Sequence, residues 1–204
     1  GTNSRDFDKV IDNIKECVKY KQEKRLDATI AAQFLVIQQN MGEVLKLAET
    51  LKSIGADNLQ IKPYSKHPLS INDLVINVEE FNKLEEGLMK YDSEKFKIYF
   101  RKQTAKRIDG GINYQECHGL PFFALIDAKG DVLPCSMFYG QDEFTYGNVY
   151  KNSFSEIWEG DKRKNVIKKI KEEGIETCRK GCRLDVINRY LDRLKFPKPH
   201  DNFI

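Results

Sequence analysis

The chain has 204 residues, enough for one medium domain or two small ones, and 40% of them are hydrophobic while 32% are charged. This composition is typical of a folded, water-soluble protein, and no run of about eighteen apolar residues predicts a membrane-spanning helix. The 34 basic and 31 acidic side chains give a net charge of +3 and are interleaved, which argues against nucleic-acid binding. No signal or transit sequence is recognisable, so we expect a cytoplasmic protein.

The first 62 residues predict a helix, a strand, a helix and a strand in turn. Apolar side chains at three- and four-residue spacing predict the first helix, with Asn3 or Ser4 as its cap: Phe7, Val10, Ile11, Ile14, Cys17 and Val18. The apolar run 28–37 has no helical period and predicts a strand buried on both faces. A helix over 44–54 and a short strand at 59–61 follow. This alternation is typical of a parallel α/β sheet, and because two strands make a poor sheet, we interpret it as the end of a larger α/β domain.

The pair Gly110-Gly111 marks a change of character and predicts a domain boundary, with one domain at 1–110 and a second at 111–204. Between residues 64 and 100 we expect a loop, a helix from Glu79 and a half-buried strand that ends at Phe100. The first domain is therefore expected to be α/β throughout.

The second domain is expected to be a small α+β unit. Its first feature is a β-hairpin within 122–133, with turn-forming residues at 127–130. Helices should follow Ser153, a good N-cap residue. Apolar side chains at helical spacing predict a last amphipathic helix that buries them: Leu184, Ile187, Tyr190, Leu191 and Leu194.

Four of the five cysteines lie in this second domain. Cys117 and Cys135 bracket the hairpin, and Cys178 and Cys182 are close together in the sequence. Clustered cysteines in a cytosolic protein indicate metal binding more often than disulfides, and four thiolates suit either a [4Fe–4S] cluster or a zinc ion. The wide separation of the first pair favours the larger cluster, although four buried core cysteines are a simpler alternative. Cys17 lies on the apolar stripe of the first helix, where we expect it to pack.

The second domain resembles a known family. Cys117 and Cys135, with Gly130 between them, are similar to the opening motif of the SPASM and twitch domains of radical S-adenosylmethionine enzymes. Downstream, Tyr146-Gly147-Asn148-Val149 and Ser153-Phe154-Ser155-Glu156-Ile157-Trp158 resemble the "GNV" and "S-F-x-E-I-W" stretches of these domains, and Cys178 with Cys182 resembles their closing pair. Four cysteines are similar to the shorter twitch form. The resemblance implies that all four bind one auxiliary [4Fe–4S] cluster.

The resemblance extends upstream with less specificity. In that family the auxiliary domain follows a partial (β/α)6 barrel, of which 28–40 and 59–62 resemble the fifth and sixth strands. It implies a place beside S-adenosylmethionine for four polar residues that follow these strands: Gln38, Asn40, Lys62 and Tyr64. Ordinary polar strand ends are the alternative. The Cys-x3-Cys-x2-Cys loop of the family, which binds the catalytic cluster, is absent from this sequence. We therefore expect an inactive C-terminal portion of such an enzyme, with S-adenosylmethionine and the second cluster bound only in the intact protein.

The expected role is electron transfer or substrate placement by the auxiliary cluster, with an electron-donor protein as partner. The substrate class (peptide, sugar or small metabolite) and the catalytic residues do not follow from the sequence, and neither a membrane nor a nucleic acid is expected as a partner. The alternative is a zinc-stabilised interaction module without catalysis. We expect His118 to face solvent, and we expect the chain to self-associate through residues 1–62, where a bare strand edge and an apolar face are predicted.

Overall fold

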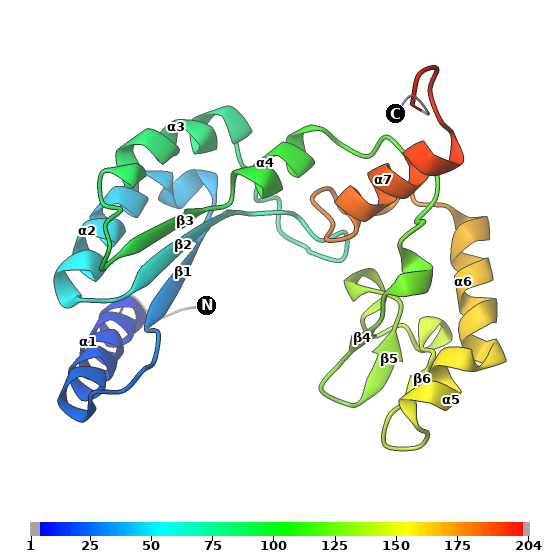
Figure 1. Ribbon diagram of the computed structural model, residues 1–204, viewed down its shortest axis with the longest axis horizontal. Helices are drawn as coiled ribbons and strands as arrows, with labels where there is room; N and C mark the ends of the chain where they lie inside the picture. Colours follow the sequence, from blue (N-terminus) through cyan, green and yellow to red (C-terminus); the bar gives the residue numbers. More distant parts are fainter. Residues whose placement is uncertain (1–4, 202–204) are drawn as a thin grey trace. The chain divides into compact units, whose positions relative to one another are not determined.

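The computed structural model describes residues 5–201 and divides into two compact units (Figure 1). The first unit comprises the chain up to Ser65 together with Asn72–Asp109. The second comprises Lys66–Ile71 and the chain from Gly110 onward. Each unit has its own core of buried apolar side chains. The helices in the described part of the chain lack the length and apolarity needed to cross a membrane.

The first unit is built on a parallel sheet of three strands in the order β1-β2-β3. The strands are β1 (Ala31–Val36), β2 (Asn58–Pro63) and β3 (Lys97–Phe100), and the register aligns Phe34 with Ile61 and Ile61 with Phe100. The helical elements are α1 (Asp6–Lys24), η1 (Gln38–Glu43), α2 (Val44–Ile54), α3 (Val78–Met89) and α4 (Lys102–Asp109). The predicted alternation and the loop before α3 are confirmed, and the third strand joins the same sheet.

One face of this sheet carries the core, and the other is partly exposed and carries polar side chains along β2. Leu59 and Ile61 are fully buried beneath the helices. The side chains that alternate with them, Gln60 and Lys62, are half-buried, and Leu35 of β1 is 43% exposed. The prediction that the first strand is buried on both faces is therefore wrong. The reason is that β1 lies at the edge of the sheet and follows a period of two, with only one set of side chains in the core.

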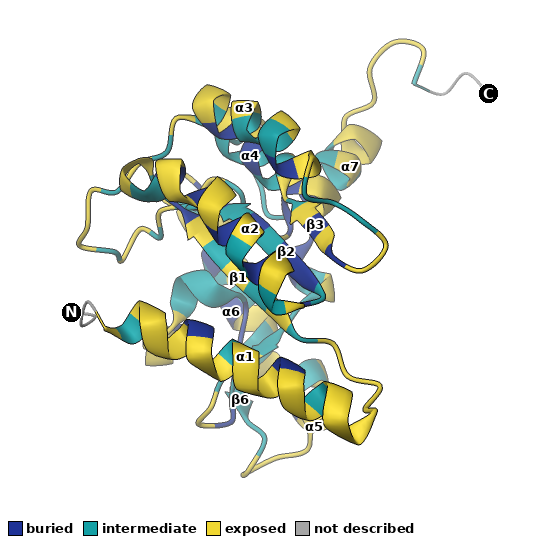
Figure 2. Ribbon diagram, turned by 90° about the vertical axis from the view of Figure 1, so that its left-hand side faces the viewer, coloured by how far each residue is buried: buried dark blue, intermediate teal, exposed yellow. Residues whose placement is uncertain are grey.

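Helix α1 buries much less of its apolar stripe than its pattern predicts. Ile11 and Val18 are buried, whereas Phe7 is 56% and Val10 53% exposed. Cys17 is also exposed, so the expectation that it packs in the core is wrong. Figure 2 shows most of the surface of α1 in the exposed class. The proposed caps at positions 3 and 4 lie outside the described residues.

The second unit contains an antiparallel sheet in the order β4-β5-β6 and three helices. The strands are β4 (Leu125–Ile126), β5 (Asp131–Leu133) and β6 (Gly147–Asn148), and the helices are α5 (Phe154–Glu159), α6 (Asp161–Glu173) and α7 (Asp185–Lys195). Single 3-10 turns are formed by η2 (Leu120–Phe122), η3 (Ser136–Phe138) and η4 (Asp142–Phe144). The predicted hairpin is confirmed as β4 and β5. Ser153 caps α5 in a capping box with Glu156, as its sequence position predicts.

Helix α7 is docked the opposite way from its prediction. Three of the apolar side chains in its predicted stripe face outward, with Ile187 44%, Tyr190 63% and Leu194 61% exposed, whereas Leu184 at its start is buried. Its polar Asp185 and Asn188 are only 2% and 1% exposed. The expectation that the last helix buries its apolar stripe is therefore wrong for these positions. Asp185 and Asn188, which are buried in place of these apolar side chains, belong to the site described next.

Candidate metal centre

Three separate segments of the second unit supply the four thiols. Cys117 precedes η2, and Cys135 follows the β4–β5 hairpin after Pro134. Cys178 and Cys182 lie in the turn between α6 and α7. All four are free thiols and only partly exposed. The last turn contains Gly181 at φ 72°, a left-handed conformation that glycine adopts without steric cost and that reverses the chain between the two cysteines.

The glycine and asparagine of the sequence motifs shape the hairpin. Gly130 closes its turn at φ 80°, and the Asp127 carboxylate accepts hydrogen bonds from the N–H groups of Lys129 and Asp131 at 2.8 and 2.9 Å. Asn148 donates to the carbonyl of Lys129 at 2.9 Å and to the Asp131 carboxylate at 2.8 Å. Asn148 of the Tyr146–Val149 motif therefore holds the hairpin turn that contains Gly130. This contact fixes the strand that leads into Cys135.

Every pair among the four thiols is close enough to interact electrostatically. Burial raises the pKa of Cys135 to about 12, and repulsion from the other three thiolates adds to this increase. Burial, with repulsion from Cys117 and Cys182, raises the pKa of Cys178 to about 11. Burial also raises the pKa of Cys117. Four thiolates so close together need cationic compensation, which a bound metal centre provides by displacing the protons.

Hydrogen-bond donors are directed at the sulfur atoms. The Leu184 N–H group donates to Cys182 Sγ at 3.4 Å, and the Asn188 side chain lies 3.5 Å from Cys117 Sγ. The backbone amide of Met137 is hydrogen-bonded to the sulfur of Cys135 and lowers the pKa that burial raises. Such donors stabilise the thiolate form that binds metal. This donor set fits a thiolate-bound cluster.

Tyr146 provides a second test of this fit. Its ring is 2% exposed, and its buried hydroxyl has no hydrogen-bond partner among the described residues. Burial raises its pKa, and the negative charges of Cys135 and Cys117 contribute to the increase. A buried hydroxyl normally has a partner. A sulfur-rich cluster beside these two thiols would supply an acceptor, so Tyr146 also fits such a group.

Polar contacts attach α7 to the segment that carries Cys117. Arg189 pairs with Asp185 of its own helix at 2.8 Å and donates to the Gly111 carbonyl. Lys195 bonds Glu116 at 2.8 Å. These contacts explain why the polar side of α7 faces inward.

His118 is part of the same interface. Its ring is 10% exposed and lies 3.0 Å from the Asp192 carboxylate of α7. The expectation of a solvent-facing imidazole is therefore wrong. The sequence signal was present in the polar stripe of α7, where Asp185, Asn188 and Asp192 recur at helical spacing directly after Cys182.

The four strand-end residues follow neighbouring strands of the first unit. The Gln38 side chain donates to Glu80 at 2.6 Å, and the Asn40 side chain bonds the backbone of Ile37 and Leu35 at 2.9 and 3.0 Å. Both amides therefore have roles within the fold. Lys62 lies on the polar face of β2, opposite Leu35 in the register.

The fourth strand-end residue, Tyr64, directly follows β2. Its N–H group bonds the carbonyl of Val36 at 2.9 Å, and its hydroxyl bonds Asn72 at 2.8 Å. The carboxyl ends of β1 and β2 are thus adjacent, and all four residues lie at or just beyond them.

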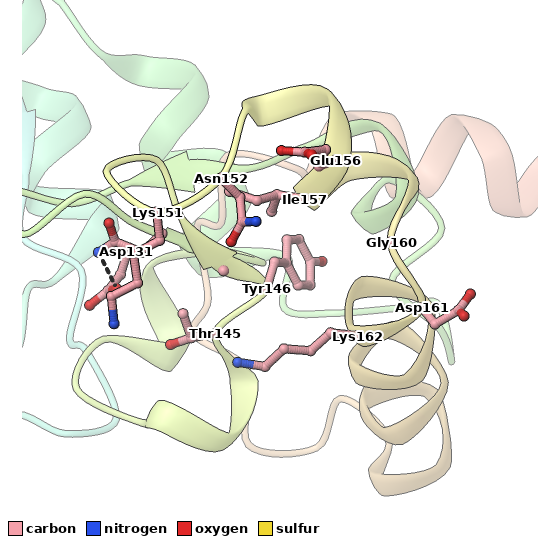
Figure 3. A pocket seen from close by; sticks show the side chains of 12 residues that line it. Asp131, Thr145, Tyr146, Lys151, Asn152, Glu156, Ile157, Gly160, Asp161 and Lys162 are labelled. Carbon is pink, nitrogen blue, oxygen red and sulfur yellow. Dashed lines mark hydrogen bonds between the residues drawn. The ribbon is translucent and has the colours of Figure 1, made fainter.

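A pocket of about 460 Å³ lies beside the Tyr146–Val149 motif rather than at the thiols (Figure 3). Tyr146 and Asn148 line it together with Glu156 and Lys162, and no cysteine does so. No three His, Cys, Asp or Glu side chains of residues 5–201 stand in an arrangement that holds a single metal ion.

Comparison with known protein families gives one match to the segment that carries the thiols. Residues 117–183 match the SPASM family, an iron-sulfur cluster-binding domain. The matched segment contains all four clustered cysteines and covers about a third of the chain. It ends two residues before α7, so the SPASM match does not include the helix that carries Asn188.

Solved structures show a similar fold over 76% of this chain. The crystal structure of Streptococcus suis SuiB is 15% identical with a TM-score of 0.53, and SuiB bound to S-adenosylmethionine is 16% identical with a TM-score of 0.50. The similarity covers only 38% and 37% of those chains, well under two-thirds of their length. Native anSMEcpe with bound AdoMet and Kp18Cys peptide is 17% identical, with a TM-score of 0.44 over 76% of this chain and 45% of that chain. No curated protein sequence matches this chain significantly.

Proposed function

We propose that the second unit binds one auxiliary [4Fe–4S] cluster through Cys117, Cys135, Cys178 and Cys182, and that the chain is part of a radical S-adenosylmethionine enzyme. The observation that carries this proposal is the set of four mutually interacting free thiols within the SPASM match. The cluster would supply a one-electron carrier or a platform for substrate placement. The chain's own residues ligate it, direct hydrogen bonds at its sulfur atoms and limit access of water.

The first unit supports the remainder of the proposal. Its three strands are parallel, as in a segment of a (β/α) barrel, and sites in such barrels lie at the carboxyl ends of the strands. We propose that β1 and β2 correspond to the fifth and sixth strands of a partial (β/α)6 barrel, with β3 as an additional strand beside β2. Gln38, Asn40, Lys62 and Tyr64, which follow these strands, would border S-adenosylmethionine there.

We expect the chain by itself to be catalytically inactive. The sequence has no Cys-x3-Cys-x2-Cys loop, so we expect no cleavage of S-adenosylmethionine by the 204-residue chain. An electron-donor protein that acts on the auxiliary cluster remains part of the proposal. The substrate of the whole enzyme is a peptide, a sugar or a small metabolite.

Anaerobic reconstitution of the purified chain with iron and sulfide tests the cluster assignment. We expect about four irons and four sulfides per chain, the content of one [4Fe–4S] cluster. Replacement of Cys117, Cys135, Cys178 or Cys182 by alanine, one at a time, should lower the iron content, because each substitution removes a ligand. Iron and sulfide analysis with the visible absorbance spectrum provides the measurement.

Cys17→Ala is the matched control, because Cys17 is an exposed free thiol on α1 in the other unit. It should retain the iron content of the unmodified chain. Full iron content in all four single variants would show that the ligand assignment is wrong. One tightly bound zinc ion in place of iron would instead support a zinc-stabilised module and overturn the proposal.

A further inference from the structure

Asn188 of α7 has a buried side chain whose orientation is fixed by its partners. It is 1% exposed, and its Oδ1 accepts a hydrogen bond from the Gly119 N–H group at 2.7 Å. Its Nδ2 lies 3.5 Å from Cys117 Sγ. Because a backbone N–H group can only donate, the oxygen must face Gly119 and the NH₂ group must face the sulfur.

The surroundings hold this amide in place. Gly119 is so close that a Cβ atom there would lie 3.2 Å from Asn188 Oδ1, which leaves no room for the side chain to move toward the backbone. Asn188 also hydrogen-bonds the Tyr114 hydroxyl. One turn earlier on α7, the buried Asp185 pairs with Arg189. The donor is therefore preorganised before any cluster binds.

We propose that Asn188 is a positioning residue that donates an N–H···S hydrogen bond to the Cys117 thiolate and thereby raises the reduction potential of the bound cluster. This inference rests on the proposed function. Reduction adds an electron to the cluster, so a donor at a ligand sulfur stabilises the reduced state more than the oxidised state. Hydrogen bonds to the sulfur atoms are among the factors that set cluster potentials, and burial strengthens their electrostatic effect.

The first test is the midpoint potential of the reconstituted 204-residue chain with Asn188→Leu, a neutral substitution of similar size that removes the donor. We expect the potential to become more negative by about 59 mV, which corresponds to a tenfold change in a one-electron equilibrium. Asn165→Leu is the control, because Asn165 is exposed on α6 of the same unit. An Asn188→Leu variant with full iron content and an unchanged potential would overturn the inference.

The second test needs no substitution and therefore remains informative if Asn188→Leu does not fold. The chain is labelled with nitrogen-15 only at asparagine side-chain amides, reconstituted and reduced, and its pulsed EPR spectrum is recorded. We expect a nitrogen-15 hyperfine coupling to the cluster, and its absence would overturn the inference. A chain that binds no iron at all would instead overturn the proposed function, and this inference with it.

Discussion

At the scale of single residues, the site combines groups that the sequence indicates with groups that only the fold reveals. The four cysteines could be predicted as ligands because they cluster in one half of the chain with recognisable spacing. Asn188 and Tyr146 could not be assigned to particular ligands: the polar stripe of α7 is visible in the sequence, but neither residue type by itself indicates which side chain lies beside it. Their positions next to Cys117 and Cys135 depend on long-range packing.

The raised thiol pKa values predict how the stability of the cluster-free chain depends on pH. The folded chain holds the proton of Cys135 to about pH 12, whereas an unfolded thiol loses it near its ordinary value of 9.0. Between these values the folded state binds more protons than the unfolded state. The free energy of unfolding contributed by this group therefore falls as pH rises above about 9 and is fully present below it.

Urea denaturation just below pH 9 and about one unit above it measures this effect. We expect the cluster-free chain to lose stability between the two conditions, and Cys135→Ala to lose less because the titrating group is absent. Equal losses of stability in the unmodified chain and in Cys135→Ala would contradict the assignment of this pH dependence to Cys135.

At the scale of elements, the periodicity of apolar residues predicts where helices and strands form. It does not always predict which side of an element faces the core. The 3.6-residue period correctly predicts α7, and the apolar stripe predicts the wrong inward face. Hydrogen bonds from His118 to Asp192, from Arg189 to Gly111 and from Lys195 to Glu116 join α7 to the segment around Cys117 and outweigh the burial of Tyr190 and Leu194. Strand β6 is also absent from the prediction, because its two residues are too few to show an alternating pattern.

The contact between α7 and the segment around Cys117 predicts that Gly119→Ala destabilises the second unit. The added Cβ would lie 3.2 Å from both Asn188 Oδ1 and Ile187 Cγ2. Such overpacking typically costs about 1–3 kcal/mol of unfolding free energy, and it should also lower iron uptake by displacing the Cys117 segment.

Gly42→Ala provides the matched comparison, because a Cβ at Gly42 meets nothing within 4 Å. Thermal and urea unfolding of the two variants should show a clear loss of stability only for Gly119→Ala. Similar stability for both would mean that α7 is not held tightly against this segment.

At the scale of the whole molecule, the sequence indicates an α/β part followed by a small α+β part. The extent to which a helix is covered was harder to predict, because an amphipathic pattern shows which side is apolar and not whether anything lies against it. Both α1 and α7 illustrate this. Phe7 on α1 and Tyr190 on α7 are each more than half exposed.

We propose, as the sequence led us to expect, that the chain self-associates through residues 1–62. The observations in support are the exposed Phe7 and Val10 on α1 and the position of β1 at the edge of its sheet. Burying one such side chain contributes about 1.5–3 kcal/mol, so Phe7→Lys should weaken association at least about tenfold. Sedimentation at several concentrations measures this.

Tyr190→Lys tests the competing surface on α7 with the same change of charge. It should leave association unchanged. If Tyr190→Lys abolishes association while Phe7→Lys does not, the interface lies on the second unit and the proposal is wrong. A chain that is monomeric at all concentrations would also contradict it.

The outward apolar side of α7 has a consequence for temperature. An ordinary amphipathic helix is attached by apolar surface, whose hydration gives its release a large positive heat-capacity change and weakens its docking in the cold. Polar side chains of α7, namely Asn188, Arg189 and Asp192, contact the Cys117 segment alongside the apolar Ile187. Exposing polar surface lowers the heat capacity, so its release should carry a small or negative change. The attachment of α7 should therefore persist on cooling, when attachments made by apolar packing weaken.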